Sequence, residues 1–169
     1  MIDAMDPSTL DEAAIEAQPR LLGIAYRMLG SMADAEDVVQ EALLKAHRAA
    51  PDDIDSPVAY LTTLTTRTAI DHLRSARVRR ESYVGPWMPE PVIDDPAADA
   101  SGPALLADSL SMAFLVVLES LSPEERAALL LYDVFGYSHA EMAKVLDRSE
   151  GASRQLLRRA RQRIEADRP

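Results

Sequence analysis

The stretch SHAEMAKVLDRSEGASRQLLRRARQRI, residues 138–164, predicts two helices joined by a tight turn. Ser138 and Glu141 have the spacing of a capping box, which marks the start of the first helix. The turn falls at Asp147, and Ser149 has the side chain and the place of an N-cap for a longer second helix. A short helix, a tight turn and a longer helix together are typical of a helix-turn-helix.

The second helix of this pair carries arginines on one side. Its apolar, packing side is formed by Leu156, Leu157, Ala160 and Ile164. Arg154, Arg158 and Arg161 fall together on the opposite side. In a helix-turn-helix the second helix lies in the major groove, where an arginine can donate two hydrogen bonds to a guanine edge. We therefore favour DNA binding over the alternative, a solvated arginine-rich helix in a bundle.

Charge is distributed unevenly along the 169 residues, whose formal net charge is −10. Residues 67–80 hold five arginines and one aspartate, and residues 148–169 hold seven arginines and three acids. The rest of the chain is acidic. For nucleic-acid binding a local basic surface matters more than the total charge. Taken alone, the first basic segment is equally compatible with a solvated helix end.

Composition argues against several classes of protein. The chain has no cysteine, so it has neither disulfides nor a thiolate metal site, and we expect a cytoplasmic location. We expect no membrane-spanning segment and no secretory leader. The three histidines lack metal-ligand spacing, and His72 and His139 are predicted to be polar helix-surface residues. Without a glycine-rich phosphate loop or a nucleophile motif, we expect neither an enzyme nor a cofactor.

Apolar residues recur at three- and four-residue spacing, which predicts an all-α fold of two small helical domains. The first domain spans residues 8–80, with two helices in residues 10–50 and a third that begins at Ser56–Pro57. Residues 81–104 hold five prolines and five acids but no base, which predicts a Pro-rich acidic linker. The second domain spans residues 105–166. Within it, a second capping box at Ser122 and Glu125 opens the helix before the helix-turn-helix.

Three segments in this order resemble the extracytoplasmic-function sigma factors of bacterial RNA polymerase. ADAEDVVQEALLKAHRA (33–49) is similar to the helix that contacts the polymerase clamp, and SPVAYLTTLTTRTAIDHLRSARVRR (56–80) to the promoter −10 helix. LESLSPEERAALLLYDVFGYSHAEMAKVLDRSEGASRQLLRRARQRI (118–164) resembles the −35-binding domain. YVGPWMPEP (83–91) is similar to a signature of members that carry a regulatory C-terminal SnoaL-like domain. We expect that domain to be absent here, because the chain ends at Pro169.

The resemblance implies sigma region 2 in the first domain and sigma region 4 in the second. It also implies the partners, which are promoter DNA and core RNA polymerase through its clamp helices and flap. The implied polymerase contacts are Asp34, Asp37, Gln40 and Glu41. The implied −10 contacts are Asp71, Arg74, Arg77, Arg79 and Arg80. The implied −35 contacts are Arg148, Ser149, Glu150, Arg154, Arg158 and Arg161.

Two positions depart from the family pattern. Asp147 stands in the turn where glycine is frequent, but aspartate tolerates the left-handed backbone, so we expect the turn to form. Ser153 stands where a small aliphatic residue is usual, and we expect its hydroxyl to bond a carbonyl of its own helix.

Two other functions are compatible with a helix-turn-helix. One is a stand-alone transcriptional regulator whose N-terminal helices dimerise or bind a ligand. The other is an adaptor that binds only proteins. The basic segment in front of the linker favours a sigma factor over a stand-alone regulator. The arginine-rich last helix argues against an adaptor that binds only proteins.

Overall fold

The computed structural model describes residues 7–49, 54–80 and 114–166, and every regular element in these ranges is helical, as predicted. In chain order the elements are α1 (Pro7–Leu29), α2 (Met32–Ala49), α3 (Pro57–Arg80), α5 (Pro123–Leu129), η1 (Leu130–Val134), α6 (His139–Leu146) and α7 (Glu150–Ala166). A short helical stretch, residues 114–119, precedes α5. The predicted linker at residues 81–104 lies outside the described residues.

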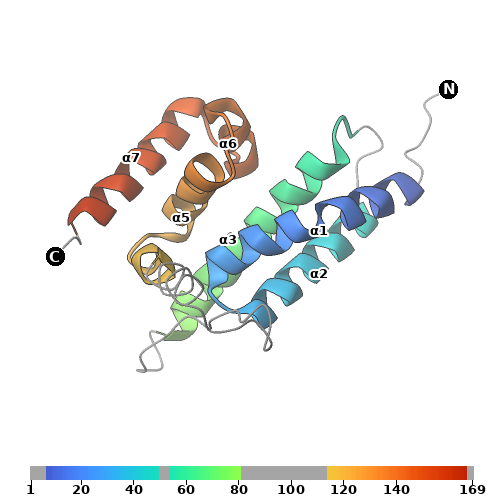
Figure 1. The fold of residues 1–169 in the computed structure, drawn as a ribbon, viewed down its shortest axis with the longest axis horizontal. Coiled ribbons are helices and arrows are strands. Elements are labelled where there is room, and N and C mark those ends of the chain that lie inside the picture. Colours follow the sequence, from blue (N-terminus) through green and yellow to red (C-terminus); the bar gives the residue numbers. More distant parts are fainter. Residues whose placement is uncertain (1–6, 50–53, 81–113, 167–169) are drawn as a thin grey trace, which may run out of the picture.

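Helices α1, α2 and α3 form the first unit (Figure 1). Local signals set their ends. Gly30 takes a left-handed φ of 72° after α1, and the Ser56 hydroxyl accepts a hydrogen bond from the Ala59 N–H (3.3 Å) at the start of α3. The largest fully buried apolar side chains of this unit are Leu21, Ile24, Met28, Val38 and Leu61. The predicted helices of the first domain are thus present.

Helix α3 packs against α1 and α2 with a face that is rich in threonine. Thr62, Thr65 and Thr66 are fully buried. The hydroxyl of Thr62 donates to the Val58 carbonyl (2.9 Å) and that of Thr66 to the Thr62 carbonyl (2.8 Å). A β-branched side chain whose hydroxyl is satisfied within its own helix packs much as valine does. Thr62 and Thr66 can therefore pack in the buried face of α3 with their hydroxyls satisfied, whereas the Thr65 hydroxyl has no partner among the described residues.

Helices α5, η1, α6 and α7 form the second unit. Both predicted capping boxes are confirmed, because the Glu125 N–H bonds the Ser122 hydroxyl and the Glu141 N–H bonds the Ser138 hydroxyl, each at 3.2 Å. After α6, Asp147 takes the left-handed conformation that was expected at the turn, with φ 52° and ψ 52°. The N-cap predicted at Ser149 is also present.

The helix that starts at α5 departs from the expected regular α-helix. Residues Leu130–Val134 form a π-helical turn, closed by a hydrogen bond from the Phe135 N–H to the Leu130 carbonyl (3.0 Å). One wide turn of this kind shifts the facing of the residues that follow it. Here it places Tyr132 against the ring of His139 and Asp133 toward α7.

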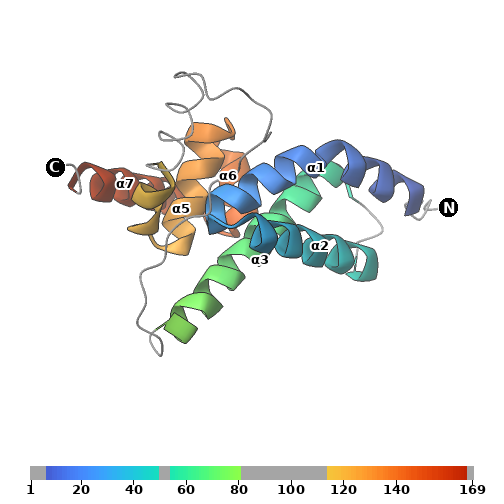
Figure 2. The same ribbon diagram turned by 60° about the horizontal axis from the view of Figure 1, so that its bottom comes forward.

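The two units pack on one another. Helix α3 contacts α5 and α6, and α1 contacts α5 and η1. Figures 1 and 2 both show α3 running from the α1–α2 side to the side where α5 and α6 lie, with α7 at the outer edge of Figure 1. The buried apolar side chains of both units form one continuous cluster. Among the described helices, none has the length and apolar character needed to cross a membrane.

Candidate nucleic-acid and polymerase interfaces

Helix α7 presents the basic surface that its sequence predicts. Its buried residues are Ser153, Leu156, Leu157 and Ala160. Arg154 and Arg158 are exposed on the other side, and Arg154 forms an ion pair with Glu150 (2.8 Å) one turn earlier. Arg148, Ser149 and Glu150 are exposed at the turn and at the start of the helix. The N-terminal half of α7 therefore exposes its basic side.

Arg161 lies on the same helix but is held by the second unit itself. Its guanidinium donates to both carboxylate oxygens of Asp133 on η1 (2.6 and 3.3 Å) and lies over the Tyr132 ring, 5.6 Å from the centroid. The hydrogen bond with Asp133 is the main reason that the pKa of Arg161 is raised. Unlike Arg158, Arg161 joins α7 to η1.

Two predictions about single residues of this unit are wrong. His139 is half-buried, stacked on Tyr132 with ring centroids 4.4 Å apart, so it packs inside the unit instead of on the helix surface. The hydroxyl of Ser153 does not bond a carbonyl of α7. It is fully buried and has no hydrogen-bond partner among the described residues.

Helix α2 carries the residues predicted to contact polymerase. Asp37, Gln40 and Glu41 are exposed, and Glu41 pairs with Lys45 at 2.8 Å. Asp34, seven residues before Glu41, is only half-exposed, and its Oδ2 lies 4.0 Å from Nε2 of His72 on α3. The acidic surface on α2 thus consists mainly of residues 37–41 and borders α3.

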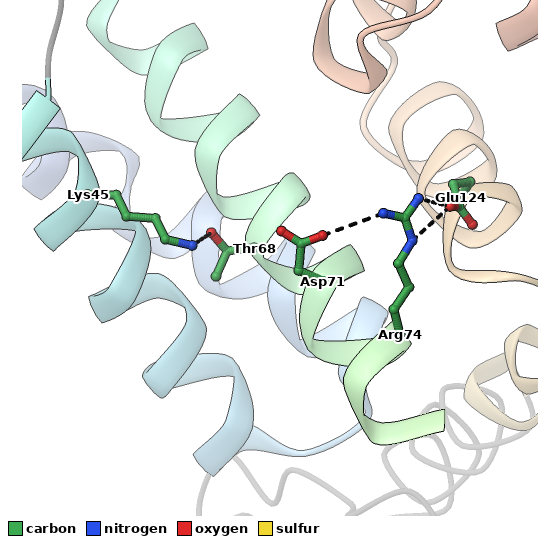
Figure 3. Close-up of polar contacts among 5 residues, drawn as sticks. All are labelled: Lys45, Thr68, Asp71, Arg74 and Glu124. Atoms are coloured by element: carbon green, nitrogen blue, oxygen red, sulfur yellow. Dashed lines mark hydrogen bonds and ion pairs between the residues drawn. The ribbon is translucent and has the colours of Figure 1, made fainter. Parts of the chain in front are cut away.

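Lys45 marks this border, since its ammonium donates to the Thr68 hydroxyl of α3 at 3.3 Å (Figure 3). The predicted −10 residues follow Thr68 along α3. Asp71 and Arg74 are exposed on successive turns, and the Arg74 Nη1 lies 3.6 Å from the Asp71 Oδ1. Arg77, Arg79 and Arg80 belong to the end of α3, and their side chains are outside the described part of the structure.

Arg74 reaches across to the second unit. Figure 3 shows its guanidinium bonded to Glu124 of α5, with Nε 3.0 Å from Oε1. The hydrogen bond that the Arg74 guanidinium donates to Glu124 is the main reason that the pKa of Arg74 is raised. Burial alone would raise the pKa of Glu124. The hydrogen bond and the charge of Arg74 act in the opposite direction, as do a backbone hydrogen bond and the charge of Arg148. Together they outweigh burial, so the pKa of Glu124 is lowered. Both groups are therefore held ionised.

Sequence reasoning missed three residues that join the units: Arg67, Glu124 and Arg126. Arg67 donates to the Val145 carbonyl (2.9 Å) and the Lys144 carbonyl (3.1 Å) at the end of α6. Arg126 is only 6% exposed and donates to the Met28 carbonyl (2.5 Å) at the end of α1. Their partners lie 50 to 98 residues away in the chain, so no local sequence signal identifies these contacts.

A groove of about 210 Å³ lies where α3 meets the turn of the helix-turn-helix. Its lining includes Arg67, Asp71 and Arg74 from α3 and Glu124, Asp147 and Arg148 from the second unit. Two predicted −10 residues, Asp71 and Arg74, and one predicted −35 residue, Arg148, thus line the same groove, with Glu124 among them.

Comparison with known proteins gives the same two regions. Residues 14–79 match the family described as Sigma-70 region 2, and residues 111–164 match Sigma-70, region 4. The ECF RNA polymerase sigma factor SigJ of Mycobacterium tuberculosis is 47% identical over 148 residues, which cover 86% of this chain and 47% of SigJ. The RNA polymerase sigma-H factor of Pseudomonas aeruginosa is 30% identical over 167 residues, which cover 95% of this chain and 86% of that protein.

Solved structures are similar too. The crystal structure of Mycobacterium tuberculosis SigJ has a TM-score of 0.66 at 41% identity, covering 88% of this chain and 50% of that one. The sigma factor RpoE, in its complex with the anti-sigma factor NepR from Bartonella quintana, has a TM-score of 0.67 at 21% identity. The match covers 94% of this chain and 98% of RpoE, and it shows that the two proteins share a fold. The chain spans about half the length of the mycobacterial relatives SigJ and SigI. With both sigma regions in order and one relative matched over most of its length, the chain belongs to the RNA polymerase sigma factors, and it is similar to several named as ECF sigma factors.

Proposed function

We propose that this chain binds core RNA polymerase and directs it to promoters by recognising −10 and −35 elements. The observation that carries the proposal is the separation of two exposed surfaces within one sigma-family chain. An acidic surface lies on α2 at Asp37, Gln40 and Glu41, and a basic surface lies on α7 around Arg154 and Arg158. One surface suits a basic protein partner and the other suits DNA.

Each surface has its own role in this proposal. The acidic residues of α2, with Asp34 at their edge, contact the polymerase clamp helices. The N-terminal half of α7, with Arg148, Ser149 and Glu150 before it, lies in the major groove of the −35 element, while region 4 contacts the polymerase flap. Asp71, Arg74 and the arginines that end α3 contact the −10 element.

The chain performs no catalysis of its own and acts in the cytoplasm, where polymerase supplies the chemistry. Strand separation at the −10 element needs no nucleotide hydrolysis by this chain. Binding to extruded bases offsets their unstacking, which costs on the order of a few kcal/mol for each base. Two weak DNA contacts joined through polymerase strengthen one another by effective concentration.

The test is a separation of two binding activities. Asp37→Lys with Glu41→Lys reverses charge on the acidic surface and should abolish co-elution with bacterial core RNA polymerase on size exclusion. Arg154→Ala with Arg158→Ala should leave co-elution intact and remove binding of the holoenzyme to −35-dependent promoters. Glu12→Lys with Glu16→Lys, at exposed positions of α1, is the control of equal charge change.

Two outcomes would overturn the proposal. If the wild-type chain does not associate with core polymerase at low salt yet binds duplex DNA, it is a stand-alone regulator. If the α7 variant loses both activities together with its helical circular dichroism signal, the arginines of α7 are structural.

A further inference from the structure

The C-terminal half of α7 is fastened to the rest of the second unit by two arginines. Arg161 donates to both carboxylate oxygens of Asp133 on η1. Arg163 Nη1 lies 3.3 Å from Oε2 of Glu125 on α5, a carboxylate that is only 3% exposed and also accepts the Ser122 N–H. Because these contacts reach two different elements, they hold α7 in one rotation about its own axis.

The N-terminal half of α7 has a different kind of ion pair, made within the helix. Arg154 Nη2 donates to Oε1 of Glu150 at 2.8 Å, and the two side chains are 59% and 50% exposed. Arg158, one turn further along, has no side-chain hydrogen bond or ion pair within the described ranges. Of the two exposed arginines on this side of the helix, only Arg154 is therefore held by a carboxylate.

Glu150 is the only acidic residue in residues 148–164. A negative charge at this place opposes binding to DNA, because it repels the phosphates. The helix dipole favours a carboxylate in the first turn, and Glu four residues before Arg is the favourable order for an ion pair. Exposed pairs of this kind add little stability, however. Stability alone is therefore a weak reason for an acid on the basic side of α7.

The ion pair has a larger effect on where the Arg154 guanidinium can go. A free arginine side chain loses rotamer freedom when it binds a base edge, and one that is already held loses less. A guanidinium has more N–H donors than one carboxylate oxygen uses. Arg154 can therefore stay bonded to Glu150 and still donate two hydrogen bonds to O6 and N7 of a guanine.

We propose that Glu150 is a positioning residue that determines specificity: it holds Arg154 in the orientation that reads a guanine, and its charge weakens binding to DNA of any other sequence. The inference rests on the proposed function, because it takes α7 as the helix that reads the −35 element. Its two effects have opposite signs. Removing the carboxylate should lower discrimination between bases while raising the affinity for unselected DNA, and a role in helix stability alone predicts neither change.

The first test asks whether the ion pair forms in solution, without polymerase or DNA. In the ¹⁵N-labelled full chain, the Nε–H signals of Arg154 and Arg158 are assigned by their loss in Arg154→Ala and Arg158→Ala. Glu150→Gln should shift the Arg154 signal and speed its exchange with solvent, and it should leave the Arg158 signal in place. An unchanged Arg154 signal would mean that Glu150 does not hold this guanidinium, and the inference would be wrong.

The second test measures base preference. The chain, bound to core polymerase, selects from a pool of duplex promoters whose −35 block is randomised, and Arg154→Ala identifies the base position that Arg154 reads. Glu150→Gln should lower the preference at this position about threefold to tenfold, part of what a bidentate contact supplies. The same variant should bind duplexes that lack the selected block about twofold more tightly.

Glu165→Gln is the matched control, because it removes one negative charge at an exposed position near the other end of α7. It should change no base preference, and circular dichroism confirms that each variant keeps its helices. In an Arg154→Ala background, Glu150→Gln should have no further effect on base preference. A loss of preference that persists in this background would mean that Glu150 contacts a base itself, and an unchanged preference in the single variant would mean that it only serves the helix end. Either result refutes the positioning role.

The failure of this inference is distinguishable from the failure of the proposed function. If the wild-type chain selects a −35 block with polymerase but Glu150→Gln selects it equally well, the inference alone is wrong. If the Arg154 signal reports the ion pair but the chain selects no sequence with polymerase, the proposed function is wrong and the role of Glu150 in promoter choice falls with it.

Discussion

Ser153 is a polar residue on the buried side of α7, and its hydroxyl has no hydrogen-bond partner within the described part of the chain. Burying an unsatisfied hydrogen-bonding group costs about 1–3 kcal/mol. Serine is also a weaker helix former than alanine. The residue therefore lowers the stability of the second unit.

Ser153→Ala should raise the free energy of unfolding by about 1 kcal/mol, which corresponds to about 2–4 °C in Tm for a chain of this size. Thermal unfolding followed by circular dichroism measures this change in Tm. Ser149→Ala is the matched comparison, because it removes the N-cap hydroxyl that accepts from the Ala152 N–H and should lower stability by about 1 kcal/mol. A lower Tm for Ser153→Ala would mean that its hydroxyl has a partner in solution.

Arg158 and Arg161 lie on one side of α7 but in different surroundings. Arg158 is exposed and available for a base edge, whereas Arg161 bonds Asp133 and covers Tyr132. Arg158→Ala should cost the holoenzyme roughly 1–3 kcal/mol of −35 discrimination and leave Tm unchanged. Arg161→Ala should lower Tm as well as DNA affinity.

Asp133→Asn provides the check on Arg161, since it removes the charge that holds the guanidinium without touching any predicted DNA contact. It should lower Tm in the same direction as Arg161→Ala. If Arg161→Ala reduces −35 discrimination while Asp133→Asn and Arg161→Ala both leave Tm unchanged, Arg161 reads DNA and does not position the helix.

Helix starts were the most predictable elements, because capping depends on residues three apart. The boxes at Ser122 with Glu125 and at Ser138 with Glu141 both formed as expected. The π-helical turn at Leu130–Val134 was not predictable in the same way. Its apolar run, LLLYDV (129–134), is compatible with a continuous α-helix, and the contacts that use the wide turn come from His139 and Arg161 further along the chain.

The capping box of α6 makes a prediction about pH. Hydrogen bonds from the backbone and side chain of Ser138 lower the pKa of Glu141, and the charges of Lys144 and Arg20 add to this effect. A carboxylate whose pKa is lower in the folded state contributes stability at neutral pH, and that stability is lost as pH falls through the lowered pKa.

Glu141→Gln keeps an acceptor at the N-cap but removes the charge. The wild type should therefore have the higher Tm at pH 7, and the difference should shrink as pH falls toward and below the usual glutamate pKa of about 4.3. Thermal unfolding of both proteins at matched pH values measures this difference. A difference that stays constant down to pH 3.5 would show that the charge of Glu141 adds nothing.

At the scale of the whole molecule, the sequence predicted the two halves and their chemistry but not how they meet. Apolar spacing and charge are local properties, and they identified the helices, the acidic residues of α2 and the basic side of α7. The pairing of Arg67 with the end of α6, of Arg74 with Glu124 and of Arg126 with Met28 depends on tertiary packing. An exposed arginine and one that binds another helix look the same in a sequence.

The most direct measurement is transcription by bacterial core RNA polymerase from a pool of templates whose upstream region is randomised, with and without this chain. Sequencing the transcript starts should reveal a set that requires the chain and shares two sequence blocks at fixed spacing, near −10 and −35. With Arg154→Ala and Arg158→Ala, selection of the −35 block should be lost. If the same transcripts arise from core polymerase alone, while the chain binds duplex DNA unaided, then it is not a promoter-directing subunit.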